Sequence, residues 1–224
     1  MKIVAIIPAY NEENRIAASV SDAIAFVDDV VVVDDCSLDK TRERALATSA
    51  YVLHHVINRG QGAALQTGVD FALRELHADV LVHFDADGQM QGSDIPALIA
   101  PVKEGRVDVA MGSRFLGAVE DLPFSRRCIL KGAILFTFLV SGLWLTDTHN
   151  GFRALSRMAA ERIRLTQNRM AHASEILDQI SAKKLRYQEI PVTIRYSVET
   201  LAKGQKNSAM FRVAWDVIKG NILK

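Results

Sequence analysis

The chain has 224 residues, of which 49% are hydrophobic, so one domain can bury a sizeable core, and its formal net charge of +1 gives no overall basic character of the kind that favours nucleic acid. The charge is unevenly spread: residues 1–100 carry 7 Lys and Arg against 15 Asp and Glu, a net −8, and residues 101–224 carry 20 against 11, a net +9. An acidic first half suits a metal site, and a basic second half suits anionic ligands or a lipid surface.

The first half of the chain alternates short apolar runs with helical patterns. Lys2–Ile7 is predicted to be a strand that Pro8 ends, and a helix is predicted from Asn11, its N-cap, to about Phe26, with acidic residues in the first turn where the helix dipole favours them. The elements predicted after these are the strands Val30–Val33, Tyr51–Ile57, Val80–Phe84 and Val107–Met111, helices that end near Ala47 and Leu76, and a helix from Asp94 to Lys103.

Strands that alternate with helices predict a largely parallel sheet covered by helices. Ligands of such sheets bind at the carboxyl ends of the strands. Polar motifs follow the first, second, fourth and fifth predicted strands at this position, and they are Pro8–Asn14, Asp34–Thr41, Asp85–Gln89 and Gly112–Phe115.

The motif Asp85-Ala86-Asp87-Gly88-Gln89 stands directly after a buried strand. Its two carboxylates, two residues apart, suit a hard divalent cation, and Mg²⁺ or Mn²⁺ is often held by one or two carboxylates together with substrate phosphates. Gln89 could add an amide oxygen. The alternative is a solvated turn, because Asp and Gly are common in turns.

The segment Asn58–Ala64 places Gly60 and Gly62 at the start of a helix, where glycines allow the backbone to approach a phosphate closely. No third glycine stands at dinucleotide spacing, so the pattern is weak support for NAD. His54 and His55 in the preceding strand are interpreted as structural, being far from any carboxylate pair.

The second half begins with a basic segment and a strongly apolar run. Gly132–Leu145 follows Arg126 and Arg127 and has 14 residues, short of the ~20 that span a bilayer. It is either a core helix or an interfacial one, and flanking basic residues with Phe138 and Trp144 favour contact with a membrane or a lipid chain. The motifs predicted after it are the segment Asp147–Arg153, a helix over Ala171–Lys184 that carries Glu175, an edge strand over Arg186–Arg195 and a basic amphipathic helix over Lys206–Leu223.

The two cysteines and the start of the chain bear on the compartment. Cys36 and Cys128, without a Cys/His cluster at zinc spacing, fit a reducing compartment better than a disulfide framework. The apolar stretch before Pro8 is too short for the hydrophobic region of a signal peptide. We therefore expect a cytoplasmic protein, and peripheral contact with the inner face of a membrane.

With these motifs in view, the chain resembles the family-2 inverting glycosyltransferases, and within them the dolichol-phosphate mannose synthase group and its bacterial relatives. The resemblance implies a GT-A fold, an α/β nucleotide-binding sheet with a metal-bridged diphosphate, as a single domain over 1–224. Residues 1–115 would form the nucleotide-sugar and metal half, and 116–224 the acceptor half. The motifs that carry the resemblance are Pro8–Glu13, Val31–Thr41, Asn58–Ala64, Asp85–Gln89, Gly112–Phe115 and Asp147–Arg153.

The family's functional residues are carried over where this sequence matches its motifs. The nucleotide sugar would be bound by Pro8, Tyr10, Glu12, Asp34, Asp35, Gly62, Asp85, Ala86 and Arg114. The metal, Mg²⁺ or Mn²⁺, would be bound by Asp85, Asp87 and Gln89. The catalytic candidates are Asp87, Asp147, Glu175 and Arg153, and the candidates for an acceptor phosphate are Arg126, Arg127, Lys203 and Lys206.

Three positions depart from the family pattern. Cys36 stands where the family usually has Gly, and Asn150 stands where it usually has Ser. Lys203–Ser208 replaces the family's Arg-x-x-Gly-x-Ser-Lys. The first two substitutions bear on fine specificity rather than on the fold, and the third bears on phosphate binding by the two lysines.

The resemblance implies a metal-dependent, inverting transfer from a GDP- or UDP-linked sugar to a polyprenyl phosphate. Such an acceptor needs no general base, because the second pKa of a phosphate monoester is ~6. A sugar hydroxyl in a polysaccharide or cell-envelope glycan is the alternative acceptor, and Asp147, Glu175 or His149 would then have to take its proton. Glu175 could equally be a solvated helix residue.

Two alternative interpretations place the chain in another class of protein. One is an inactive nucleotide-binding partner of a membrane protein, which the intact Asp85 and Asp87 pair opposes. The other is a nucleotidyltransferase, which typically has a Gly-rich basic loop after the first strand, whereas Pro8–Glu13 is neither. A membrane-protein partner or a homo-oligomer is compatible with the sequence.

Overall fold

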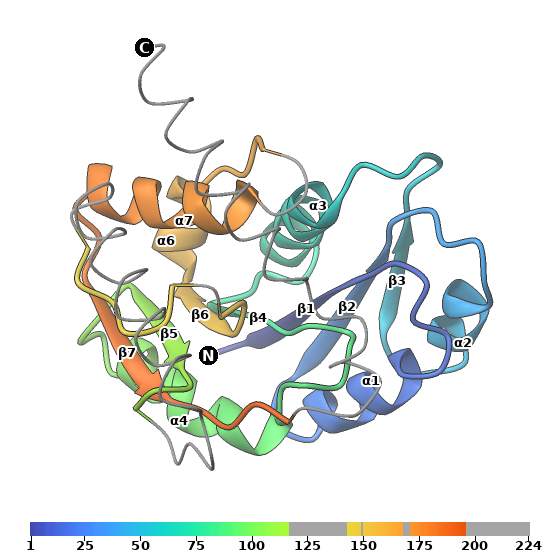
Figure 1. Ribbon diagram of the computed structural model, residues 1–224, viewed down its shortest axis with the longest axis horizontal. Coiled ribbons are helices and arrows are strands. Elements are labelled where there is room, and N and C mark those ends of the chain that lie inside the picture. Colours follow the sequence, from blue (N-terminus) through green and yellow to red (C-terminus); the bar gives the residue numbers. More distant parts are fainter. Residues whose placement is uncertain (117–142, 149, 168–170, 196–224) are drawn as a thin grey trace, which may run out of the picture.

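The computed structural model describes residues 1–116, 143–148, 150–167 and 171–195, which form a mixed, mainly parallel sheet with helices on both faces (Figure 1). The strand order in the sheet is β3-β2-β1-β4-β6-β5-β7. The strands are β1 Ile3–Ala9, β2 Asp29–Asp34, β3 Tyr51–His54, β4 Val80–His83, β5 Val109–Ser113, β6 Arg153–Ser156 and β7 Tyr187–Pro191. The helices are α1 Ile16–Ile24, α2 Thr41–Leu46, α3 Gln61–Arg74, α4 Ile95–Lys103 with the 3₁₀ turn η1 Gly92–Asp94 before it, α6 Arg157–Arg162 and α7 Ala171–Ala182.

The predicted α/β sheet is confirmed. Strands β3, β2, β1 and β4 run parallel, and β5 runs parallel to β7. The exception is β6, which lies antiparallel between β4 and β5. The position of β7 at the edge of the sheet agrees with the expectation drawn from Pro191, which cannot donate to a neighbouring strand.

Two apolar layers hold the sheet between its helices. In β2, Val31 and Val33 face the layer packed under α3, α6 and α7, whereas Val30 and Val32 face the layer under α1 and α4. Successive side chains of a strand point to opposite faces, so an unbroken run of valines is what a strand covered on both faces requires. Figure 1 shows the two helical layers on either side of the sheet.

The first strand runs further than predicted. Pro8 does not end β1, because β1 continues to Ala9, and Pro8 pairs in register with Val33 of β2. On the other side, β4 pairs with β1 only as far as Ile6 and His83. The carbonyl of Ala9 faces β2, where it accepts from the amide of Asp35, so the nitrogen of Pro8 faces the side where β4 has ended. The missing N–H of Pro8 therefore costs the sheet no hydrogen bond.

The first helix begins later than predicted. Asn11 does not cap it, because α1 begins at Ile16 and Asn11 lies in the left-handed region with φ +56°. Glu12 and Glu13 consequently precede the helix rather than form its first turn. Asn tolerates the left-handed conformation better than most residues, so the same side chain that suggests an N-cap can instead form a turn.

Only the end of the apolar run at 132–145 lies within the described residues. Leu143 and Leu145 are buried against the α3 and α7 layer, Trp144 is 62% exposed, and the three residues are not helical. The rest of that run and the predicted helix at 206–223 lie outside the described residues. Among the helices that the structure describes, none has the length and apolar character needed to cross a membrane.

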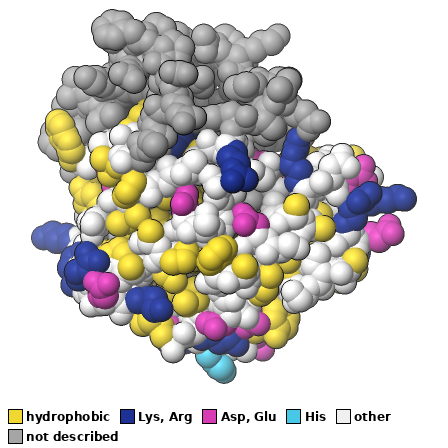
Figure 2. Space-filling view, turned by 90° about the horizontal axis from the view of Figure 1, so that it is seen from below, with side chains coloured by type: hydrophobic (Ala, Val, Ile, Leu, Met, Phe, Trp, Pro, Cys, Tyr) yellow, Lys and Arg dark blue, Asp and Glu magenta, His cyan; other side chains and the backbone are white. Residues whose placement is uncertain are grey.

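The face that carries α1 and α4 mixes apolar and charged side chains. Figure 2 views this face, where hydrophobic side chains reach the surface in the middle, with Lys, Arg, Asp and Glu side chains spread among and around them. This distribution does not single out a lipid-binding surface on this side of the protein.

Candidate active site

Three loops converge at the carboxyl ends of the parallel strands, and this end of the strands is the edge of the sheet that is meant below. Because β1 lies between β2 and β4, the segments that follow these parallel strands are neighbours. They carry Tyr10 and Glu12, the pair Asp34 and Asp35, and the Asp85–Gln89 motif. The sequence prediction that these motifs share one site is consistent with this arrangement.

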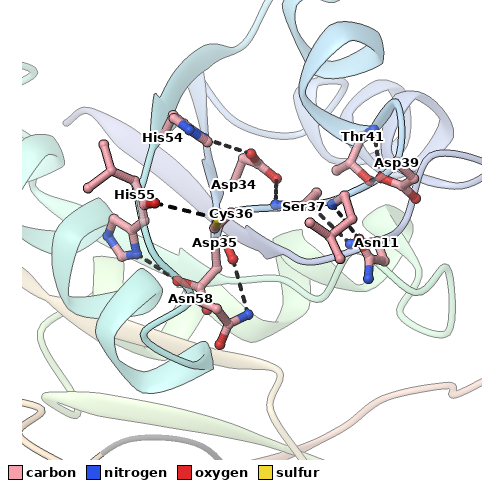
Figure 3. A network of polar contacts seen from close by, with 12 residues as sticks. Asn11, Asp34, Asp35, Cys36, Ser37, Asp39, Thr41, His54, His55 and Asn58 are labelled. Atoms are coloured by element: carbon pink, nitrogen blue, oxygen red, sulfur yellow. Dashed lines mark hydrogen bonds and ion pairs between the residues drawn. The ribbon is translucent and has the colours of Figure 1, made fainter.

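The loops after β1 and β2 are held together by short polar contacts. The Asn11 amide donates to Ser37 Oγ at 3.0 Å, and Asn11 Oδ1 accepts from the Leu38 amide at 2.8 Å. The Glu12 amide donates to Thr41 Oγ1 at 2.7 Å. Figure 3 shows Asn11 lying beside Ser37. The Glu12 carboxylate pairs with Arg15 at 3.0 Å, and Tyr10 next to it is exposed.

The acidic pair Asp34 and Asp35 is buried and bonded to two histidines. His54 Nδ1 lies 2.8 Å from Asp34 Oδ2, and His55 Nδ1 lies 2.7 Å from Asp35 Oδ1 (Figure 3). The premise that these histidines are far from any carboxylate pair is therefore wrong. They stand about 20 residues later in the chain and reach the pair because β3 lies beside β2.

Cys36 occupies a position that favours glycine. Its φ is +63°, in the left-handed region where a side chain is strained, and its Sγ lies 3.7 Å from the carbonyl of Val56. This conformation gives a physical reason for the glycine that the family pattern carries there.

Asp85 is held between α3 and the segment that leads into β6. Gln61 Nε2 donates to Asp85 Oδ1 at 3.0 Å, and a Cβ added at Gly151 would lie 2.9 Å from Asp85 Oδ2. Burial, followed by the charge of Asp87, raises the pKa of Asp85 to about 7, against the opposing effects of Arg153 and Gln61. A cation bound beside Asp85, in addition to the Arg153 guanidinium, would therefore stabilise the ionised form of this carboxylate.

The rest of the motif turns around Asp87. Its Oδ1 accepts from the Gln89 amide at 3.0 Å, and the carbonyl of Ala86 accepts from Ser19 Oγ at 3.0 Å. Gly88 provides a φ of +73° for the turn. The backbone carbonyl of Gln89 accepts from the Arg195 amide, which joins this loop to the segment after β7.

The residues present suit a divalent metal that also binds substrate. No group of three or more His, Cys, Asp or Glu that could hold a metal occurs among the described residues. Two neighbouring carboxylates, one of them disfavoured as an anion, are nevertheless the oxygen ligands that Mg²⁺ takes when phosphate oxygens and water complete its shell. The predicted ligand set of Asp85, Asp87 and Gln89 therefore stays a prediction.

Arg153 is buried beneath this edge of the sheet. Burial lowers its pKa to about 10, and the charges of Asp85 and Asp147 oppose that effect. Its neighbour across the sheet is His83, whose pKa falls to about 3 through burial and then through the charges of Arg153 and His172, so that this imidazole is neutral. Within the described residues, both ring nitrogens of His83 and the Nε of Arg153 lack a hydrogen-bond partner.

Asp147 makes a two-pronged ion pair with Arg114. Arg114 Nε donates to Asp147 Oδ2 at 2.7 Å and its second guanidinium nitrogen donates to Oδ1 at 2.8 Å, while the Arg114 amide adds a third bond. The ion-pair partner of Asp147 among the described residues is thus Arg114. Glu189 of β7, which no sequence signal indicated, accepts from the Thr146 and Asp147 amides and fixes this loop.

Glu175 is buried on α7, so the alternative hypothesis that it is a solvated helix residue is wrong. Its carboxylate accepts from the amides of Thr166 and Gln167 at 2.9–3.0 Å and from Thr166 Oγ1 at 2.5 Å. The side chain therefore holds the segment that precedes α7.

Gly62 is needed for packing. A Cβ at Gly62 would lie 2.4 Å from the Gln167 carbonyl and 2.8 Å from His172 Cβ, which explains a glycine there without a phosphate. Its predicted nucleotide contact stays a prediction. The candidates Arg126, Arg127, Lys203, Lys206 and His149 lie outside the described residues.

Comparison with known proteins gives consistent matches. The model of Glycosyl transferase family 2 matches residues 4–164. The chain is 30% identical over 235 residues to the UDP-N-acetylglucosamine–dolichyl-phosphate N-acetylglucosaminyltransferase of Methanococcus voltae, covering 95% of this chain and 93% of that protein. It is 31% identical over 234 residues to the polyprenol monophosphomannose synthase of Mycolicibacterium smegmatis, covering 97% and 87%. A glucosyl-3-phosphoglycerate synthase structure from Mycobacterium tuberculosis, in complex with Mn²⁺, UDP and phosphoglyceric acid, matches with a TM-score of 0.66 at 18% identity, covering 90% and 73%.

Proposed function

This chain belongs to glycosyl transferase family 2, in the group that resembles dolichol-phosphate mannose synthases, and we propose that it transfers a sugar, with inversion, from a nucleoside diphosphate sugar to a polyprenyl phosphate. The glycosyltransferase class and the GT-A fold, both expected from the sequence, are confirmed. The donor, the metal and the acceptor belong to the proposal.

On the donor side, Asp35 and Asp34 would meet the nucleoside, and Asp85 and Asp87 would hold Mg²⁺ or Mn²⁺ against the diphosphate. The M. tuberculosis structure with Mn²⁺ and UDP supports this assignment, as does the raised pKa of Asp85, which a cation would offset. When bound, the metal neutralises the charge that develops on the leaving diphosphate. Asp35 has about one acceptor position left for a ligand, because three of the roughly four on a carboxylate are taken by protein donors.

The observation that carries the choice of acceptor is the state of the two candidate carboxylate bases. Both oxygens of Asp147 accept from Arg114, and both oxygens of Glu175 accept from Thr166 and Gln167. Both carboxylates thus hold loops of the protein in place, which favours a structural role over that of a general base. A phosphate acceptor, already ionised near neutral pH, needs no such base.

Arg153 is better suited to balancing charge than to binding the acceptor directly. It is 2% exposed and lies near Asp85 and Asp147, so its charge stabilises the two carboxylates from below the site. The candidates for the acceptor phosphate are then Arg126, Arg127, Lys203 and Lys206. Arg114 is tied to Asp147, and its proposed contact with the donor phosphate would have to be made in that paired state.

The substitution Glu175→Gln tests the acceptor. If Glu175 were the general base for a hydroxyl, its loss would lower the transfer rate by roughly 10²–10⁴. We expect a much smaller fall, because Gln keeps one carbonyl acceptor for the Thr166 and Gln167 amides. Transfer to a short polyprenyl phosphate would be measured beside the thermal unfolding midpoint, which separates lost packing from lost chemistry. A collapse in rate with an unchanged midpoint would show that the reaction needs Glu175 as a base, which contradicts the reason given for a phosphate acceptor.

A further inference from the structure

The segment Asn58–Gln61, called the bridge segment here, joins β3 to α3 and contacts both acidic centres of the site. Its first three residues bond to Asp35, and its last residue bonds to Asp85. The two aspartates lie at the ends of different strands, β2 and β4, with β1 between them. The bridge segment is thus a direct physical connection between the proposed nucleoside side and the proposed metal side.

At the first end, Asp35 holds the backbone of the segment in place. Its carboxylate accepts from the Arg59 amide at 2.9 Å and from the Gly60 amide at 2.6 Å, and its carbonyl accepts from Asn58 Nδ2 at 3.1 Å. Gly60 has a φ of +88°, which places it among the conformations open to glycine. Asp35 therefore fixes the course of the chain directly before α3.

His55 in turn fixes Asp35. A carboxylate can only accept, so the His55 nitrogen 2.7 Å from Asp35 Oδ1 carries the hydrogen. The other ring nitrogen lies 2.9 Å from Thr67 Oγ1 on α3, and the side chain is buried. His55 thereby ties Asp35 to the same helix that the bridge segment leads into.

At the second end, Gln61 orients Asp85. Its amide group donates to Oδ1 at 3.0 Å, while the close approach of Gly151 limits the space beside Oδ2. Partners that hold a metal-binding carboxylate in one orientation contribute to the affinity of the site even though they do not touch the metal.

We propose that His55 and Gln61 are positioning residues for Asp85. His55 holds Asp35, Asp35 holds the bridge segment, and Gln61 at the end of that segment sets the orientation of the Asp85 carboxylate. This inference rests on the proposed metal role of Asp85 and Asp87. His54 provides a matched control, because it has the same side chain one residue earlier but bonds to Asp34. The other hydrogen bond that this carboxylate accepts among the described residues comes from the backbone amide of Ser37.

The test compares four single variants of the full chain: Gln61→Leu, His55→Ala, His55→Asn and His54→Ala. Binding of Mn²⁺ would be measured by electron paramagnetic resonance, alone and with UDP or GDP. We expect Gln61→Leu to weaken Mn²⁺ binding by about 10-fold. We expect His55→Ala to weaken Mn²⁺ binding several-fold and His55→Asn to restore it, because the Asn amide replaces the donor to Asp35. His54→Ala should leave Mn²⁺ binding unchanged when it is measured without nucleotide.

A second measurement needs no metal. Amide hydrogen exchange at Gly60 should accelerate in His55→Ala and stay at the wild-type rate in His54→Ala, and the ¹³C shift of the Asp85 carboxyl should move in both His55→Ala and Gln61→Leu. Equal exchange in the two His→Ala variants, or an Asp85 shift that ignores His55, would overturn the inference. If the wild-type protein bound no Mn²⁺ with either nucleotide, the proposed metal role would be wrong. Hydrogen exchange at Gly60 and the ¹³C shift of Asp85 would still show whether the bridge segment positions Asp85.

Discussion

Individual carboxylates of this protein differ in how their oxygens are occupied, and the difference separates their roles. Asp147 and Glu175 accept on both oxygens from neighbouring protein groups, so they hold loops together. Asp85 has one amide donor and a second carboxylate beside it, and its pKa is raised to about 7. A carboxylate that is disfavoured as an anion gains most from a bound cation.

The substitution Asp87→Asn is predicted to lower transfer by at least about 100-fold, because one of the two carboxylates proposed to bind the metal beside the diphosphate loses its charge. Removal of divalent metal with EDTA should have the same effect on the unmodified protein. Transfer would be followed with a radiolabelled nucleotide sugar, and circular dichroism would verify the fold.

The control for this substitution is Asp79→Asn. Asp79 lies at the start of β4, at the opposite end of the strand from Asp85, where its carboxylate accepts from the Lys2 amide. This variant should keep its activity. Full turnover of Asp87→Asn, or of the wild-type protein in EDTA, would exclude the metal role.

At the level of elements, the strand β6 and the helix α6 were not predicted from the sequence. The strand β6 is only four residues long and contains Arg153, so it shows no apolar alternation, and its position between β4 and β5 comes from pairing with partners far away in the sequence. The strongly apolar runs of β1, β2 and β4, by contrast, have the pattern of strands buried on both faces, and the sequence predicts that these strands exist and lie in a mainly parallel sheet.

The site was predictable to a similar extent and for the same reason. The acidic motifs after β2 and β4 stand at strand ends, which sequence alone locates. The contacts that hold those motifs join residues many positions apart, such as Glu189 with Asp147 and Gln61 with Asp85, and no local pattern reports them. Asn11 was placed wrongly because the same short polar side chain favours both an N-cap and a left-handed turn.

The ion pair of Asp108 and Arg186, which joins the starts of β5 and β7, predicts a pH-dependent stability. The pKa of Asp108 is lowered, mainly by the hydrogen bond from Arg186. Burial of the carboxyl acts in the opposite direction. A carboxyl whose pKa is lower in the folded state stabilises the protein above its unfolded pKa of about 3.9, and this stabilisation disappears as the pH falls through the folded value. Asp108→Asn should therefore lower the unfolding midpoint at pH 7, with a difference that shrinks below pH 4.

The exposed pair Glu104 and Arg106 is the control for this prediction. Both side chains are more than half exposed, so Glu104→Gln should leave the midpoint nearly unchanged at either pH. Thermal unfolding of the two variants and the wild type at pH 7 and below pH 4 makes the comparison. A constant difference for Asp108→Asn at every pH would show that packing, rather than the ion pair, is responsible.

Across the whole molecule, the acidic motifs of the first half and the loop before β6 meet at one edge of the sheet. Asp85 accepts a hydrogen bond from Gln61 of α3 and lies close to Gly151, so residues from both halves of the chain come together at one site. This arrangement suits an enzyme that binds a donor through its first half and brings an acceptor to the donor through its second.

The proposed acceptor is tested by comparing two lipids of equal chain length, a short polyprenyl phosphate and the corresponding polyprenol. The protein would be incubated with each, with Mn²⁺ or Mg²⁺ and with a panel of UDP- and GDP-linked sugars, and lipid-linked sugar would be quantified. We predict transfer to the polyprenyl phosphate with one of the donors and none to the polyprenol, because only the phosphate supplies an ionised nucleophile. Transfer to a glycan hydroxyl, with the polyprenyl phosphate inert under the same conditions, would contradict the proposed acceptor.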